Sequence, residues 1–596
     1  MGLDRTLVEA GMGKRHADLA VVDGRLVNVV TGEIYMADVA IYGSKIAAVG
    51  DVDRHIGPET ETIDARGSLL VPGLIDGHIH CEVTKLSMSM FARLVLPRGT
   101  TSIVSALDQI AGVAGLRGVK EFLAEARRTP LKVHYGIPSK LPYTTPSSTL
   151  NHTFGPREAR IASRWPESVG VWETGPETIL GAPDGGLPPD RKVIEVIEIA
   201  EERRLLTFGS APLLRGDRLS GFVCAGIRSD HESYTAEESL EKLRDGLYIM
   251  IRESSVVKFL KENIKVVTED GVQSRRIAFC TDDVTASDVL EHGHLDEMVR
   301  KAISYGVDPI SAIQMATLNC AELYHIDGSV GSISPGRTAD ILLVKDLRRF
   351  KVGAVIADGE VVSSDGRMTG ERADRPRGGH RFTRSINVKP FSSEDLVVRS
   401  ALSAGNVRAI AMRVEKGAPF LRKRHEVSLR LQDGIVMPDP SQDVLYVAAI
   451  ERHKRTGNIA VAFINGFGIR EGALASSVSP DDNNILCIGS SSREIEHAAR
   501  EVMALGGGQA AVRRGLVLAS IPLPIGGIVA DVEPEAMAEM ERRLDGAARS
   551  LGCELPSPFM SMIFLSITAT PDYAIIDRGL VDTASLKVVD PVIGPA

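Results

Sequence analysis

The feature of the sequence that most restricts its fold is an apolar run, residues 71–75, that leads into His78 and His80. Side chains of an extended strand alternate between its two faces, so both histidines point to one side and can bind one cation. Neutral imidazole suits zinc, manganese, iron or cobalt. A bare His-x-His pair is more often a surface or core pair. Here Pro72-Gly73-Leu74-Ile75-Asp76-Gly77 precedes it and Cys280-Thr281-Asp282-Asp283 follows about 200 residues later, which favours a metal site.

The composition limits the class of protein. Of 596 residues, 43% are apolar and 25% are charged, as in ordinary globular proteins. The net charge of −9 argues against a nucleic-acid partner held by a basic field. Residues 1–20 have no apolar core and no run of about 18 apolar residues occurs, so we expect neither a secretory signal nor a membrane span. Six cysteines without a pattern fit the reducing cytoplasm better than a disulfide framework.

Residues 71–330 alternate short apolar strands with helical stretches such as residues 115–128, 191–203, 235–246 and 254–267. Eight strand-helix steps predict an α/β fold, a (β/α)8 barrel of the TIM type, with functional side chains at the carboxyl ends of the strands. A single closing helix is expected over residues 308–324, with Asp308 and Pro309 as its start signals. We expect the strands to end near His80, Ser105, Pro138, Glu173, Gly209, His231, Arg252 and Asp282.

Short alternating strands on both sides of this region, residues 17–70 and 336–362, are expected to pair into one sheet. Residues 1–70 with 331–372 would then form a small β-sandwich domain into which the barrel, residues 71–330, is inserted. Residues 374–380 have the composition of a linker. Residues 385–596 are expected to form a C-terminal α/β domain, with strands at 444–451, 458–465 and 484–489 and a helix at 492–505.

Several separate motifs in one order make the chain resemble the amidohydrolase superfamily and, within it, the bacterial adenine deaminases. The barrel motifs are Leu74-Ile75-Asp76-Gly77-His78-Ile79-His80-Cys81-Glu82, Pro97-Arg98-Gly99-Thr100-Thr101, His231-Glu232-Ser233-Tyr234, Met250-Ile251-Arg252-Glu253, Cys280-Thr281-Asp282-Asp283 and His292-Gly293-His294-Leu295-Asp296. The C-terminal motifs are Gly457-Asn458-Ile459-Ala460, Phe463-Ile464-Asn465-Gly466-Phe467-Gly468-Ile469 and Leu523-Pro524-Ile525-Gly526-Gly527. The resemblance implies metal-dependent hydrolysis of an exocyclic amine.

The resemblance also implies a ligand set for a divalent metal, with manganese preferred, zinc or iron as alternatives, and one or two ions. The matching positions are His78, His80, Glu173, His231 and Asp282. Glu173 as a strand-end salt-bridge residue and His231 as a satisfied buried histidine are the structural alternatives.

The chain departs from the family pattern at three places. Ser210 stands where the family has a histidine at the fifth strand, and Ala106-Leu107-Asp108-Gln109 replaces Asp-Pro-His-Glu. In the third domain, Pro480-Asp481-Asp482-Asn483-Asn484 replaces His-Asp-Ser-His-Asn. Four family histidines are therefore absent, which leaves open a one-metal or a two-metal centre. His134 and His152 are candidate substitutes for the ligand missing at Ser210.

The mechanism implied by the resemblance is attack of a metal-activated water on the amino-bearing carbon of adenine. Asp282, beside Asp283, would accept the proton of the water and pass it to the leaving amine. Glu82, Arg252 and Glu253 are expected to bind the ring nitrogens of a small purine-like substrate, with ordinary ion pairs as the alternative. We expect a cytoplasmic homo-oligomer. Two other functions stay open: hydrolysis of another N-heterocycle or cyclic amide, and a binding role in a catalytically weak relative.

Overall fold

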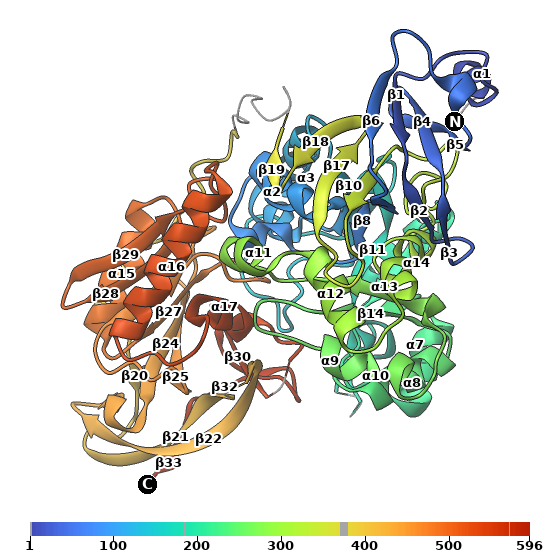
Figure 1. Cartoon of the computed structure of the whole chain (residues 1–596). Helices are drawn as coiled ribbons and strands as arrows, with labels where there is room; N and C mark the ends of the chain where they lie inside the picture. The colour runs from blue at the N-terminus through green and yellow to red at the C-terminus, as the bar shows by residue number, and fades with distance from the viewer. Residues whose placement is uncertain (1–2, 184–185, 370–379, 416, 571) are drawn as a thin grey trace.

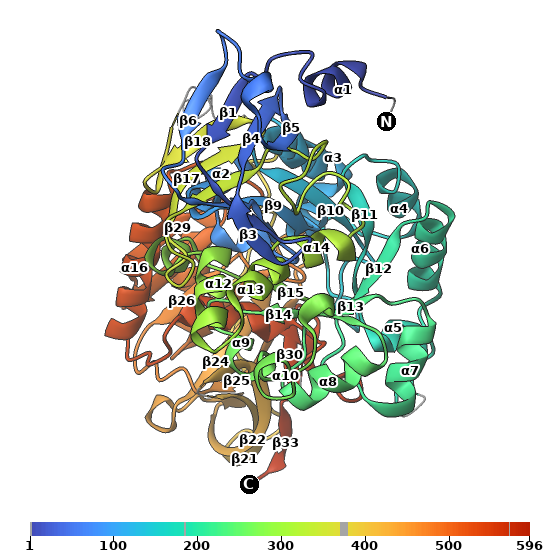
Figure 2. The same ribbon diagram turned by 45° about the vertical axis from the view of Figure 1, so that its right-hand side comes forward.

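The computed structural model describes residues 3–183, 186–369, 380–415, 417–570 and 572–596. Within these residues, eight parallel strands form a barrel at the centre of the molecule (Figure 1 and Figure 2). One arc has the strand order β12-β11-β10-β9-β8 and the other β13-β14-β15. Parallel bridges from Thr207 to Ile227 and from Ile79 to Asp282 join the arcs, which confirms the expected (β/α)8 barrel. The strands are β8 (Leu74–Asp76), β9 (Thr100–Ser105), β10 (Lys132–Pro138), β11 (Ser168–Thr174), β12 (Leu206–Gly209), β13 (Ser229–Asp230), β14 (Tyr248–Arg252) and β15 (Ile277–Cys280).

The barrel strands are apolar on both faces because each face meets other protein rather than water. Alternate residues of β14 separate into two hydrophobic clusters: Met250 packs with Ile75 and Trp172, whereas Ile249 and Ile251 pack with the surrounding helices. This packing leaves the carboxyl ends of the strands as the place where polar side chains gather, as the strand-end pattern of the sequence indicated.

Two of the expected helical stretches, residues 191–203 and 235–246, match helices of the structure within two residues at each end, whereas the stretch expected over residues 254–267 forms only two short helices, 260–263 and 265–268. The segment α3 (Asp108–Ala126) is broken at Gly115, whose φ of 66° and ψ of −170° are not helical, so the expected stretch 115–128 corresponds to its second part. The prediction of a single closing helix over residues 308–324 is wrong, since two helices form there and the first ends before Ala316. The helix is interrupted because the carbonyl of Ala316 accepts a hydrogen bond from the amide of Ile75 (2.8 Å). The helices are α2 (Met88–Val95), α3 (Asp108–Ala126), α4 (Pro156–Ala162), α5 (Pro176–Leu180), α6 (Arg191–Glu202), α7 (Gly216–Cys224), α8 (Ala236–Arg244), α9 (Leu260–Asn263), α10 (Lys265–Thr268), α11 (Ala286–His292), α12 (Leu295–Ser304), α13 (Pro309–Met315) and α14 (Leu318–Leu323).

The segments on either side of the barrel pair as inferred from the sequence: β7 runs antiparallel to β16, with Val71 opposite Leu342. A sheet of order β19-β18-β17-β16-β7-β2-β3 shares one hydrophobic cluster with a sheet of order β5-β4-β1-β6, so that a β-sandwich results. The domain boundaries stay a prediction, and residue 372 and linker residues 374–379 lie outside the described residues. The elements are α1 (Arg5–Gly11), β1 (Leu19–Val22), β2 (Arg25–Asn28), β3 (Glu33–Met36), β4 (Asp38–Tyr42), β5 (Lys45–Gly50), β6 (Glu61–Asp64), β7 (Leu69–Pro72), β16 (Ile341–Val344), β17 (Val352–Ala357), β18 (Glu360–Ser364) and β19 (Arg367–Met368).

The C-terminal part is built on a large sheet of order β20-β23-β22-β21-β25-β24-β27-β26-β28-β29, with β33 paired to β21, and a small sheet β30-β31-β32. The strands and the helix expected from the sequence are present within a residue or two of their predicted ends. The elements are β20 (Val398–Arg399), β21 (Gly405–Glu415), β22 (Ala418–Gln432), β23 (Ile435–Val436), β24 (Val444–Ile450), β25 (Ile459–Asn465), β26 (Ala473–Ser476), β27 (Ile485–Gly489), α15 (Ser492–Ala504), β28 (Gly508–Arg513), β29 (Leu516–Pro522), α16 (Pro534–Ser550), α17 (Pro558–Ile563), β30 (Tyr573–Ile576), β31 (Gly579–Asp582), β32 (Lys587–Val589) and β33 (Val592–Pro595).

Polar contacts fasten the C-terminal part to the barrel, and α17 lies between the two in Figure 1. Ser87 donates to Asp531 (2.9 Å), and the amide of Thr149 donates to Asp577 (2.9 Å). Lys85 and Glu541 form an ion pair at 2.7 Å in which both side chains are buried. Among the described helices, we find none that is both long and apolar enough to cross a lipid bilayer.

The buried Lys85–Glu541 ion pair gives the first testable prediction. Glu541→Gln leaves the Lys85 ammonium buried without its counter-charge, so we expect a loss of about 3 kcal/mol of unfolding free energy. The shift of the first urea-unfolding transition, followed by circular dichroism, measures it. Glu539→Gln on the same helix is the matched control, because Glu539 is half exposed and its partners among the described residues are surface arginines. Equal stability of the two variants would contradict the assignment.

Candidate metal centre

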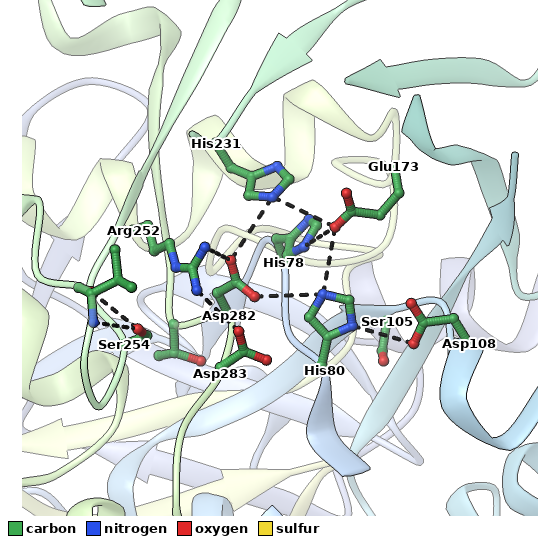
Figure 3. A network of polar contacts seen from close by, with 12 residues as sticks. His78, His80, Ser105, Asp108, Glu173, His231, Arg252, Ser254, Asp282 and Asp283 are labelled. Atoms are coloured by element: carbon green, nitrogen blue, oxygen red, sulfur yellow. Dashed lines mark hydrogen bonds and ion pairs between the residues drawn. The ribbon is translucent and has the colours of Figure 1, made fainter. Parts of the chain in front are cut away.

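Five side chains from four barrel strands meet at the carboxyl ends of the strands: His78, His80, Glu173, His231 and Asp282. Figure 3 shows them pointing toward one another. Glu173 Oε1 lies 3.1 Å from His78 Nε2, 3.5 Å from His80 Nε2 and 3.6 Å from His231 Nε2. Asp282 lies 3.5 Å from His80 Nε2 and 3.8 Å from His231 Nε2 through its two oxygens. Side chains up to about 200 positions apart therefore lie close together at one end of the barrel.

The donor atoms fit a divalent cation. The ligand atoms of His78, Glu173 and His231 all lie within 4.8 Å of one another, and so do those of His78, His80 and Asp282. His78 Nε2 is buried and faces Glu173 Oε1 without hydrogen-bond geometry, so its lone pair is available. Imidazole nitrogens with carboxylate oxygens are the donor set of zinc, manganese and iron sites.

The electrostatics of His78 and Glu173 favour the protonation states that a ligand needs, whereas those of Asp282 do not. Burial, with His231 close by, holds the pKa of His78 well below its ordinary value, so this imidazole is neutral. Burial by itself raises the pKa of Glu173, but His231 and His78 outweigh it and hold that pKa well below its ordinary value. Burial raises the pKa of Asp282 to about 7, against the opposing charge of Arg252. Asp282 is thus a carboxyl that exchanges a proton near neutral pH in the absence of a cation.

Backbone geometry turns two of these side chains into the barrel mouth. Glu173 and Asp282 have left-handed φ values of 51° and 61°, which L residues other than glycine rarely adopt and which cluster at functional sites. The amide of Asp282 donates to His78 (2.9 Å), and the amide of His80 donates to Asp282 (3.1 Å). Beneath them, buried Asp76 accepts the amides of His78 (3.2 Å) and Thr281 (3.1 Å), which ties the first strand to the last.

Asp108 has a role that sequence reasoning missed, since it was noted only as a departure from the family motif. Its Oδ1 lies 3.3 Å from His80 Nδ1 at the end of the second strand. A carboxylate on the far nitrogen of a histidine ligand fixes the ring and leaves the other nitrogen free for a cation. Burial lowers the pKa of His80, but Asp108 and Glu173 outweigh it and raise that pKa well above its ordinary value. The signal available in the sequence was an aspartate just beyond a barrel strand.

The site opens into a cavity of about 200 Å³ between the barrel and the C-terminal part. The barrel and its loops contribute mostly polar residues: His80, Asp108, Ser139, Lys140, Tyr143, Glu173, Gly175, Pro176, Glu177, Thr178, Ser210, Pro212, His231, Glu232, Arg252, Asp282 and Asp283. The C-terminal part contributes a mainly apolar wall: Phe420, Pro480, Asp481, Ile563, Phe564, Ile567, Ala569 and Thr570. Among the described residues, His134 and His152 belong to none of the side-chain groups that could hold a metal ion, so neither replaces the ligand missing at Ser210.

The remaining predicted residues fall into two groups. Arg252 and Asp283 line the cavity: Arg252 contacts Asp282 (2.8 Å) and Asp283 (3.0 Å), and it also pairs with Glu232, which the sequence reasoning passed over. Glu82 is fully buried and burial raises its pKa to about 7, yet it is not part of the described lining.

Glu253 also lies away from the described cavity lining. Its carboxylate pairs with Lys301 (2.9 Å) and accepts the amide of Leu260 (3.1 Å). The position after Arg252 therefore turns outward, because successive residues of an extended strand face opposite sides. The structure thus brings one of the three expected substrate-binding residues, Arg252, into the cavity, and it gives Glu253 the alternative role of an ion-pair residue.

Comparison with known families agrees with this architecture. The model for the amidohydrolase family matches residues 69–362, and that for the adenine deaminase C-terminal domain matches residues 420–587. A barrel of this kind with a divalent-cation ligand set at its mouth is the architecture of the amidohydrolase class.

Curated relatives extend the match over nearly the whole chain. Adenine deaminase 4 of Rhizobium meliloti (strain 1021) is 50% identical over 590 residues, which cover 98% of this chain and 97% of the relative. Adenine deaminase 1 of Desulfotalea psychrophila is 46% identical over 99% of this chain and 98% of its own length. Adenine deaminase 1 of Latilactobacillus sakei subsp. sakei is 42% identical over the same shares. The chain belongs to the adenine deaminase family.

The contact between Asp108 and His80 predicts a measurable effect on metal affinity. Asp108→Ala removes the carboxylate that orients the His80 ring, so we expect about 10- to 100-fold weaker binding of Mn²⁺. Asp108→Asn keeps an acceptor oxygen and should lose less. Competition with a chromogenic chelator measures the affinity, and His80→Ala, which removes a ligand itself, sets the scale.

Asp270→Asn is the control for this comparison, because Asp270 is exposed and is not part of the described cavity lining. If Asp108→Ala binds Mn²⁺ as tightly as Asp270→Asn does, then Asp108 does not position the ligand.

Proposed function

We propose that the protein is a metal-dependent aminohydrolase that converts adenine and water to hypoxanthine and ammonia. Membership of the family supports it, as does the name that the curated relatives share, adenine deaminase. The observation that carries the proposal is the convergence of three imidazoles and two carboxylates at one end of a cavity large enough for a small heterocycle.

In this proposal His78, His80, Glu173, His231 and Asp282 hold the cation. A divalent ion bound there supplies Lewis-acid activation of water. Manganese is our first choice, with zinc or iron as alternatives. Whether one or two ions bind depends on how well Ser210 and the retained ligands complete a second position. We also propose a cytoplasmic homo-oligomer; the six cysteines, all free in the structure, are consistent with a reducing compartment.

The residues of the chain have distinct tasks in the proposed reaction. Asp282 accepts the proton of the attacking water and passes it to the exocyclic nitrogen, which leaves as ammonia while the ring carbon gains oxygen. Arg252, held between Asp282 and Asp283, fixes the orientation of the Asp282 carboxylate. Asp108 keeps His80 in one ring orientation. The apolar wall of the C-terminal part excludes bulk water, which strengthens each of these interactions.

A second candidate function is hydrolysis of another N-heterocycle or cyclic amide. The observation that favours it is the changed lining: Ser210 and Asp108 stand in the cavity at positions where the family motifs carry histidines. The two candidate functions are separated by comparing the rate of hydrolysis of adenine with the rates for a panel of aminopurines, aminopyrimidines and cyclic amides. A purely binding role is disfavoured, because a convergent set of cation ligands serves no purpose in a silent protein.

Removal of the proposed proton carrier tests the reaction. Asp282→Asn keeps the shape of the side chain but cannot carry the proton, so ammonia release from adenine should fall by about 10²- to 10⁴-fold. Elemental analysis should still find most of the metal, because four of the five ligands remain. Asp270→Asn on the surface should match the unaltered protein. Rates like those of the unaltered protein in Asp282→Asn would refute the role of Asp282.

A further inference from the structure

The C-terminal part does more than cover the barrel, because it builds one side of the active-site cavity. Phe420 from the long strand β22, Ile563 at the end of α17, and Phe564 and Ile567 just after it form an apolar surface opposite the barrel ligands. An apolar surface with aromatic rings suits the face of a planar heterocycle.

Two polar side chains interrupt this apolar wall, Asp481 and Thr570, and the Thr570 hydroxyl accepts from Arg422. Asp481 lines the cavity, and among the described residues we find no hydrogen-bond donor or ion-pair partner for its carboxyl group. Two nearby side chains, those of Asp482 and Asn484, do have hydrogen-bond partners. Asp482 accepts the amide of Asn484 (3.0 Å), and Asn484 donates to Thr149 (3.1 Å). A half-buried carboxyl group without a partner is costly, so its place in the wall points to a partner that comes from the cavity.

The segment that carries Asp481 is held firmly in place. Ser566 donates to the carbonyl of Pro480 (2.6 Å) and lies 3.0 Å from Ser479 through the hydroxyl oxygens. These contacts join the segment of Asp481 to the segment of Phe564.

A buried arginine secures the second segment in turn. Arg422, which is fully buried, donates to the carbonyls of Phe564, Ile567 (2.8 Å) and Thr570 (2.7 Å). The apolar surface and the carboxyl group therefore form one preorganised unit rather than a mobile flap.

We propose that Asp481 is a specificity-determining residue whose carboxyl group hydrogen-bonds a ring-nitrogen edge of the substrate while the apolar wall packs on its face. This assignment rests on the proposed function, since the amino-bearing carbon must then face the barrel ligands. The carboxyl group accepts from a ring N–H or, when it is protonated, donates to a ring nitrogen. The C-terminal part thus selects the substrate, and the barrel performs the chemistry.

The test combines residue and substrate changes. Asp481→Ala, Asp481→Asn and the surface control Asp270→Asn are compared with the unaltered protein on adenine and on 1-deaza-, 3-deaza- and 7-deazaadenine. We expect Asp481→Ala to raise KM for adenine at least tenfold with unchanged metal content. We also expect the penalty for one of the deaza analogues, present in the unaltered protein, to disappear in Asp481→Ala. That analogue identifies the ring nitrogen that Asp481 contacts.

Asp481→Asn guards against a folding failure of the alanine variant. It keeps the size of the side chain but not its charge or acidic proton, so we expect a smaller rise in KM and a reduced penalty for the same analogue. If both variants keep the KM and the analogue penalties of the unaltered protein, the assignment of Asp481 is wrong while the proposed function stands. If the unaltered protein releases no ammonia from adenine, the proposed function fails and this assignment fails with it.

Discussion

The backbone pairing between the first and last barrel strands is the contact on which the rest of the site depends. His78 and His80 follow the first strand, and Asp282 follows the last, yet the amide of His80 and the amide of Asp282 each find a carbonyl across this seam. Buried Asp76 adds hydrogen bonds to both strands just below it. Because a barrel has no free edges, closure at this seam brings residues about 200 positions apart to within hydrogen-bond distance.

Closure of the barrel also gathers several negatively charged side chains in one buried site. Several carboxyl groups, among them Glu173, Asp282 and Asp283, lie in a cavity that burial makes unfavourable for anions. Three histidines and the guanidinium of Arg252 offset part of this cost, and a divalent cation would offset more of it. The need to balance these negative charges explains why Arg252 pairs with both Asp282 and Asp283. It also explains why Asp108 lies against the imidazole of His80.

The C-terminal part shows how a second domain changes what a barrel can do. A (β/α)8 barrel presents ligands at one end and leaves the space above them open to water. Here the apolar wall that contains Phe420, Phe564 and Ile567 covers that space. The buried Arg422 holds this wall in place by donating hydrogen bonds to several carbonyls of one loop. Ser566, in the same loop, donates to the carbonyl of Pro480 and so joins the segment of Asp481 to this wall.

The sequence by itself predicted the barrel and the pairing of its flanking strands, because strands alternate and parallel strands end at one rim. Its motifs, through their resemblance to a known family, supplied the candidate cation ligands at those strand ends. Only the tertiary structure decided which neighbouring side chains reach the cavity. It placed Asp108 against His80 and Asp481 into the wall, turned Glu253 toward Lys301, and split the closing helix at Ala316. The reason is physical, because each of these outcomes depends on a partner supplied by another part of the chain, which spacing along one strand or helix does not encode.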